Sequence, residues 1–191
     1  MNRRSYLKGI LVFGTVAVTS FSVFEWFSLN KTVNPEDFFK KRAVLAELTE
    51  LIIPETDTPG AKQAGVNEYI INVMVNCYPF RLQHKFLDGI NDFERYTEST
   101  FNKKFLDCSF AEKNRALAYF ERKSGFSNRI VSKINNKIFG EPFFSKLKNL
   151  TVEGYCLSQP GATRGLAYDY IPGSYQACIP LSVHQKSWAT K

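Results

Sequence analysis

The stretch EPFFSKLKNLTVEG, residues 141–154, has the pattern of a helix that packs one face into a core. Its proline suits the first turn of a helix, where a backbone N–H has no intrahelical acceptor. Phe143, Leu147, Leu150 and Gly154 then recur at helical spacing on one face. We therefore predict an amphipathic helix, with Gly154 allowing a neighbouring backbone to come close.

Similar helical patterns occupy most of the preceding chain of this 191-residue protein. Asn34, followed by proline and two acids, predicts a capped helix start, and apolar residues repeat from there to a stop at Pro54. Further helices are predicted from Asn67, which would cap the second, from Phe80, and from a capping-box pattern that begins at Ser109. The positions expected to face the core are Leu45, Leu48, Ile52, Tyr69, Ile70, Val73, Met74, Phe86, Ile90, Phe93, Phe110, Leu117 and Phe120.

Two long segments interrupt this helical pattern, residues 54–66 and the tail from residue 158 onward. Their proline and glycine content argues against regular structure, and residues 58–61 and 160–163 predict tight turns. A short helix is also expected over residues 128–139. We predict an all-α domain of five or six helices with two long structured loops and an extended C-terminal tail. That single domain covers residues 31–191.

The first 30 residues have the layout of an export signal. Arg3 and Arg4 precede an almost uncharged run over residues 9–24, and the pair resembles the twin-arginine signal of bacterial proteins exported in the folded state. The run is shorter than the ~20 residues that span a bilayer comfortably. Removal is favoured, while an anchor with Trp26 and Phe27 at the interface is the alternative. Either way, we expect the domain in the bacterial cell envelope, in or facing the periplasm.

The four cysteines, Cys77, Cys108, Cys156 and Cys178, show no Cys-x-x-Cys spacing, and the chain has only 2 histidines. A zinc or iron–sulfur site is therefore not predicted. In an oxidising compartment the cysteines are disulfide candidates, and a Cys156–Cys178 bridge would staple the segment between them. Buried free thiols and a bond to a partner chain are the alternatives.

Sequence patterns of catalysis and of nucleic-acid binding are both missing. No nucleophile elbow, dinucleotide fingerprint or phosphate-loop spacing occurs, so no catalytic residue is predicted. The net charge of +7 comes from basic residues scattered among acids, so no nucleic-acid partner is expected. Asp57 is expected to accept backbone N–H bonds or to pair with a cation. The alternative hypothesis is a stand-alone enzyme in which the Asp57 loop, Tyr168 and Asp169 surround a small ligand.

The two loops carry residue types that are enriched at protein interfaces. Large amphipathic tyrosine rings lie close in sequence to the planar guanidinium of Arg164. The competing interpretation is that the tail wraps its own helices. The expected partner interface consists of Thr56, Asp57, Thr58, Pro59, Gly60, Tyr155, Gly161, Thr163, Arg164, Tyr168, Tyr170 and Tyr175.

Together the loops and the helical middle resemble the gluconate 2-dehydrogenase subunit 3 family over roughly residues 38–181. The similarity is carried by LIIPETDTPGAKQAGV (51–66), LTVEGY (150–155), GAT (161–163) and YDYIPGSY (168–175). This resemblance implies a small, non-catalytic subunit of a bacterial membrane-associated sugar or polyol dehydrogenase.

The same resemblance implies the partners and the cofactor. The catalytic subunit would be a flavoprotein of the glucose-methanol-choline type that carries FAD, while this chain binds no cofactor itself. A cytochrome c subunit often accepts the electrons in such complexes. The small subunit usually holds the export signal, so the flavoprotein would fold around FAD in the cytoplasm and leave with this chain through the twin-arginine translocation machinery.

Overall fold

The computed structural model describes residues 32–124 and 141–171, with 173, 178, 180 and 183–189 of the tail. In this part of the chain the α-helices are α2 (Pro35–Lys40), α3 (Arg42–Ile52), α4 (Val66–Cys77), α5 (Phe80–Phe101), α6 (Phe110–Ser124) and α8 (Phe143–Leu157), with a 3-10 turn η1 (Phe105–Asp107) and a π-helical turn η2 (Gly161–Gly165). The expected all-α class is confirmed. The export segment with Arg3 and Arg4, the helix expected over 128–139, and Tyr175 lie outside the described residues.

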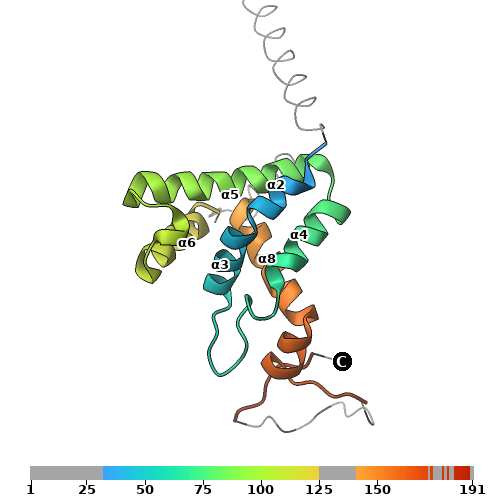
Figure 1. The fold of residues 1–191 in the computed structure, drawn as a ribbon. Coiled ribbons are helices and arrows are strands. Elements are labelled where there is room, and N and C mark those ends of the chain that lie inside the picture. The colour runs from blue at the N-terminus through green and yellow to red at the C-terminus, as the bar shows by residue number, and fades with distance from the viewer. Residues whose placement is uncertain are drawn as a thin grey trace, which may run out of the picture.

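Helix α8 lies at the centre of the packing and contacts α3, α4, α5 and α6. Figure 1 shows α5 across one end of the molecule, with α3, α4 and α8 running away from it. Leu147 and Leu150 are buried, as their spacing predicted. A Cβ at Gly154 would lie 2.5 Å from Tyr69 Cδ1, so the close neighbour is a tyrosine ring of α4 and not a backbone. None of the described helices is long and apolar enough to cross a membrane.

The N-terminal helical region is two helices, whereas the sequence predicted one. The expected cap is confirmed, because the side chain of Asn34 accepts the N–H of Glu36 at 3.1 Å. At Lys41 the backbone leaves the helical conformation (φ −90°, ψ 2°) and separates α2 from α3. Phe38 is fully buried before this bend and stacks on Phe86 of α5. Tertiary packing of this kind overrides local helix propensity.

The predicted cap was wrong at the start of α4 and is confirmed at the start of α6. Asn67 was predicted to cap α4 but lies buried inside it, and Gly65 (φ 69°) occupies the cap position. The capping box of α6 is confirmed, because Ser109 N–H donates to Glu112 Oε2 at 2.7 Å. Phe110 was expected in the core, yet its side chain is 70% exposed. It is the first residue of α6, and the residues that this helix buries begin further along it.

The tail is more helical at its start than predicted. Residues 160–163 belong to a helical turn and not to a tight turn, because the chain bends at Ser158 and then continues into η2. Ser158 organises this turn, since its Oγ accepts the N–H of Gly161 at 3.0 Å and its carbonyl accepts that of Ala162 at 2.9 Å. Beyond η2 the chain is extended at Leu166, and Ala167 forms an isolated bridge with Trp188.

Candidate functional site

The two loops predicted from the sequence lie together at the end of the molecule remote from α5 (Figure 1). We call this region the loop junction: the α3–α4 loop, residues 53–65, and the C-terminal segment, residues 155–171. Tyr155 joins its halves by donating a hydrogen bond of 2.8 Å from its hydroxyl to the carbonyl of Pro59. Tyr155 is only 7% exposed, so the bond lies inside the junction and is protected from water.

The turn η2 is shaped around Tyr155. A Cβ at Gly161 would lie 2.0 Å from the carbonyl oxygen of Tyr155, and one at Gly165 would lie 2.4 Å from its hydroxyl oxygen. Ser158 Oγ donates to the same carbonyl at 2.7 Å. Side chains at these glycine positions would therefore push η2 away from the tyrosine. Gly161 and Tyr155, both expected at the partner interface, are buried supports of the junction.

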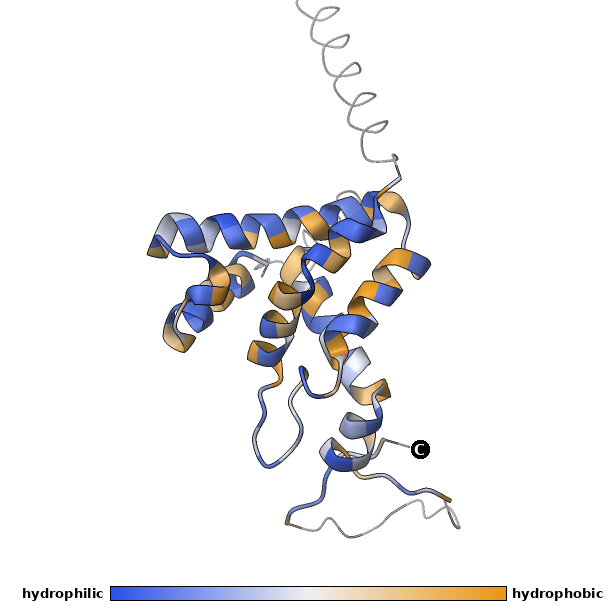
Figure 2. Cartoon of the chain, in the orientation of Figure 1, coloured by the Kyte–Doolittle hydropathy of each residue, from blue (hydrophilic) through white to orange (hydrophobic). Residues whose placement is uncertain are grey.

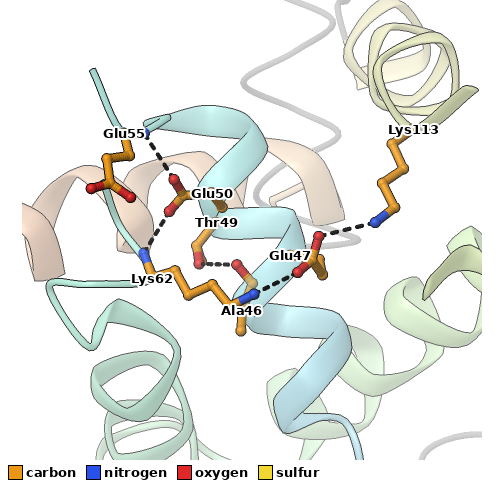
Figure 3. Close-up of polar contacts among 7 residues, drawn as sticks. All are labelled: Ala46, Glu47, Thr49, Glu50, Glu55, Lys62 and Lys113. Carbon is orange, nitrogen blue, oxygen red and sulfur yellow. Dashed lines mark hydrogen bonds and ion pairs between the residues drawn. The ribbon is translucent and has the colours of Figure 1, made fainter. Parts of the chain in front are cut away.

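Glu50 of α3 fixes the α3–α4 loop to the helix that precedes it (Figure 3). Its carboxylate accepts the backbone N–H groups of Glu55 and Lys62, each at 2.8 Å. Gly60 passes so close that a Cβ there would lie 2.3 Å from Glu50 Oε1. One carboxylate thus holds both sides of the loop. A side chain at position 60 would displace this carboxylate from its two N–H donors.

Glu47, one turn earlier on α3, ties the loop to α6. It forms ion pairs with Lys62 at 2.7 Å and with Lys113 at 3.0 Å (Figure 3). Lys113 is only 12% exposed, and its ammonium lies 5.4 Å from the centre of the Phe105 ring. Hydrogen bonds from Lys62 and Lys113 lower the pKa of the Glu47 carboxyl, although partial burial opposes them. The ionised form of Glu47 is therefore favoured in the folded chain.

The tip of the α3–α4 loop is held by its own hydroxyl groups. Thr56 Oγ donates to Asp57 Oδ1 at 3.0 Å and lies 3.3 Å from Thr58 Oγ. Asp57 was expected to accept backbone N–H groups or to pair with a cation. That expectation is wrong within the described residues, because Asp57 accepts from the Thr56 hydroxyl, and the carboxylate that accepts loop N–H groups, those of Glu55 and Lys62, is Glu50. Thr56 and Asp57 are exposed and Thr58 is half-buried, while Pro59 and Gly60 are buried.

Exposed aromatic and aliphatic side chains extend along the C-terminal segment. Thr163, Arg164 and Tyr168 are exposed, and Tyr170 is 84% exposed. The sequence prediction missed two further exposed apolar residues, Leu157 at the end of α8 and Ile171. Figure 2 shows apolar residues reaching this end of the molecule. We call Leu157, Arg164, Tyr168, Tyr170 and Ile171 the junction surface.

A second stretch of the tail supports the junction surface. The N–H of Ala167 donates to the Ser187 carbonyl, and the N–H of Ala189 donates to the Ala167 carbonyl, both at 2.8 Å. Lys186 Nζ donates to the carbonyl of Arg164 at 2.5 Å. The segment that carries Tyr168 and Tyr170 therefore begins at a residue whose N–H and carbonyl are both hydrogen-bonded to the second stretch of the tail.

The four cysteines are free thiols in this structure, with Cys108 buried and the other three exposed. A Cys156–Cys178 bridge therefore stays a prediction. Within the described ranges, no group of three or more His, Cys, Asp or Glu residues is placed to hold a metal ion.

The described surface has two hollows that bear on the enzyme hypothesis. One, of about 760 Å³, lies beside α5 and η1, and the other, of about 330 Å³, lies between α3 and α6. Neither is lined by Asp57, Tyr168 or Asp169. These three residues therefore share neither hollow.

Comparison with known proteins points to one function class. The model of the protein family described as Gluconate 2-dehydrogenase subunit 3 matches residues 40–173, well over half of the chain. The match includes α3 through η2 and both halves of the loop junction. No curated protein and no solved structure matches the chain.

The substitution Tyr155→Phe should lower the free energy of unfolding by about 1–3 kcal/mol, because it leaves the buried carbonyl of Pro59 without its donor. Tyr170→Phe, at an exposed tyrosine, is the matched control and should stay within about 0.5 kcal/mol of wild type. Urea unfolding followed by circular dichroism measures both. Equal effects of the two substitutions would contradict the structural role of the Tyr155 hydroxyl.

The Glu47 ion pairs should make stability depend on pH. Since the folded pKa of Glu47 is lowered, its contribution is complete above the unfolded value of ~4.3 and is lost as pH falls through the folded value. Glu47→Gln should therefore cost about 1–2 kcal/mol at pH 6, and less as the pH is lowered below ~4.3. Unfolding free energies measured from pH 6 to pH 3, with Glu98→Gln as a surface control, test this. A cost that stays constant over that range would argue against it.

Proposed function

The chain belongs to the gluconate 2-dehydrogenase subunit 3 family, and on that premise we propose that it is the non-catalytic small subunit of an exported FAD-dependent sugar dehydrogenase. Family membership makes it a subunit of a dehydrogenase complex. The further proposal is that it escorts and stabilises a catalytic flavoprotein of the glucose-methanol-choline type, which carries the FAD. The observation that carries this proposal is the loop junction, which is internally fixed and presents exposed rings outward.

The junction surface has the properties of a protein-binding surface. Leu157, Tyr170 and Ile171 leave large apolar side chains in water, and Tyr170 and Ile171 are adjacent in the chain. Exposed apolar area of this kind is a mark of interaction sites. The backbone just before Tyr168 is already held by hydrogen bonds at Ala167, and Leu157 is carried by α8. A surface fixed before contact loses less conformational freedom on binding. A standard interface buries about 800 Å² on each partner, an area to which both halves of the junction can contribute.

The proposed escort role needs two parts of the chain, the N-terminal export signal and the junction surface that binds the partner. Arg3 and Arg4 followed by an apolar run fit the twin-arginine route, which transports folded proteins. A flavoprotein that must fold around FAD in the cytoplasm can use this route if it is bound to a chain with the signal. We place the assembled complex in the periplasm or at the periplasmic face of the inner membrane, with a cytochrome c subunit as the proposed electron acceptor.

Loss of the chain should abolish export of its partner. A tagged wild-type chain is first used to purify the flavoprotein from the native envelope and identify it. That flavoprotein is then co-expressed with wild-type chain, with an Arg3→Lys/Arg4→Lys chain, or alone. We expect periplasmic dehydrogenase activity to fall at least tenfold in the last two cases, because the flavoprotein is then not bound to a chain with a twin-arginine signal. Equal periplasmic activity in all three would refute the escort role.

The junction surface should bind that flavoprotein directly. Arg164→Ala, Tyr168→Ala and Tyr170→Ala are each expected to weaken the complex about tenfold, since exposed aromatic and arginine side chains are frequent hot spots. Phe80→Ala, at an exposed ring on α5, is the control. Affinity is measured by surface-based binding, and folding by circular dichroism. If the three substitutions instead unfold the isolated chain, the tail packs on its own helices and the proposed surface is incorrect.

A further inference from the structure

The hollow of about 330 Å³ lies beside the loop junction, between α3, the start of the α3–α4 loop and the start of α6. Its apolar lining comes from Leu51, Pro54 and Phe110. Phe110 is 70% exposed, although the capping box of Ser109 and Glu112 fixes the backbone that carries it. The Phe110 ring is therefore exposed to water at a defined position. It lies at the edge of a hollow that no other side chain of the described protein fills.

The charged lining of this hollow is acidic, although the chain as a whole has a net charge of +7. It consists of Glu47, Glu50, Glu55 and Lys113. Lys113 is already paired with Glu47. No salt bridge joins Glu50 or Glu55 to a described residue, and Figure 3 draws no contact from the Glu55 carboxylate to the other labelled residues. The hollow thus offers an apolar wall beside carboxylate charge that the described residues leave without an ion pair.

We propose that this hollow receives a segment of the catalytic dehydrogenase subunit that presents a large apolar side chain next to a lysine or arginine. The apolar side chain packs between Phe110 and Leu51, and the cation pairs with Glu55. This assignment rests on the proposed function, because the partner is the same flavoprotein. Charge complementarity selects a basic segment, since an acidic segment or an anionic membrane surface would be repelled by the carboxylates.

Continuity with the loop junction supports the same partner. Pro54 and Glu55 line the hollow, and the next residues, Thr56 and Asp57, form the exposed tip of the α3–α4 loop. Glu50 of α3 connects the two regions, because it lines the hollow and accepts an N–H group of the loop. One partner that covers the loop tip can therefore extend over Phe110 without a gap, and the complex gains an anchor on the α6 side.

The test uses the full chain and the flavoprotein that co-purifies with it. Phe110→Ala and Glu55→Lys are compared with Phe80→Ala and Glu98→Lys. Phe80 is a matched control because it is also an exposed phenylalanine at the first residue of a helix. We expect dissociation constants to rise at least tenfold for Phe110→Ala and Glu55→Lys, and less than twofold for the controls. The effect of Glu55→Lys should shrink when salt is raised from about 0.05 to 0.5 M, because screening weakens exposed charge pairs.

Two outcomes separate this inference from the proposed function. If Phe110→Ala and Glu55→Lys bind like wild type while Tyr170→Ala weakens the complex, the hollow is not part of the interface and only the inference is overturned. If the wild-type chain does not bind the flavoprotein at all, both are overturned. Phe110→Leu keeps an apolar side chain and should retain more affinity than Phe110→Ala, which distinguishes packing in the hollow from a general effect on α6.

Discussion

The hydrogen bond between the Tyr155 hydroxyl and the Pro59 carbonyl is the constraint on which the outer surface of this protein depends. Tyr155 lies in the last turns of α8, which contacts α3, α4, α5 and α6 and buries Leu147, Leu150 and Gly154. The bond therefore transmits the position of the core to a loop 96 residues away in sequence. Without it, the direct hydrogen bond between the α3–α4 loop and the C-terminal segment is lost, and their relative position has more conformational freedom to lose on binding.

The two carboxylates of α3 hold the same loop by different chemistry. Glu50 accepts backbone N–H groups, which fixes the path of the loop but leaves the negative charge without an ion-pair partner among the described residues. Glu47 forms ion pairs with Lys62 and Lys113, which fixes the loop against α6. One acid thus sets the shape of the loop and the other its placement. The charge on Glu50 is then available to the adjoining hollow.

Helix starts were predictable from the sequence where the determinant is local. Asn34 and Ser109 cap their helices through residues two or three positions away, so the pattern alone identifies them. The bend at Lys41 and the helical turn after Ser158 were missed because distant packing produces them: burial of Phe38 at the first, and the fit of η2 around Tyr155 at the second. The helical spacing of apolar residues continues across such a bend, so the spacing alone does not show where the chain bends to pack on a neighbouring element.

The candidate site was predicted as a set of surface residues, and the structure divides that set by burial. Tyr155, Pro59, Gly60 and Gly161 are supports, whereas Arg164, Tyr168 and Tyr170 lie outside. A sequence motif cannot separate these roles. It restricts the residue type both at positions that shape a surface and at positions that contact a partner. Under the proposed function the distinction has a physical meaning. The supports fix the loops before contact, so the exposed rings meet the partner with less ordering left to lose.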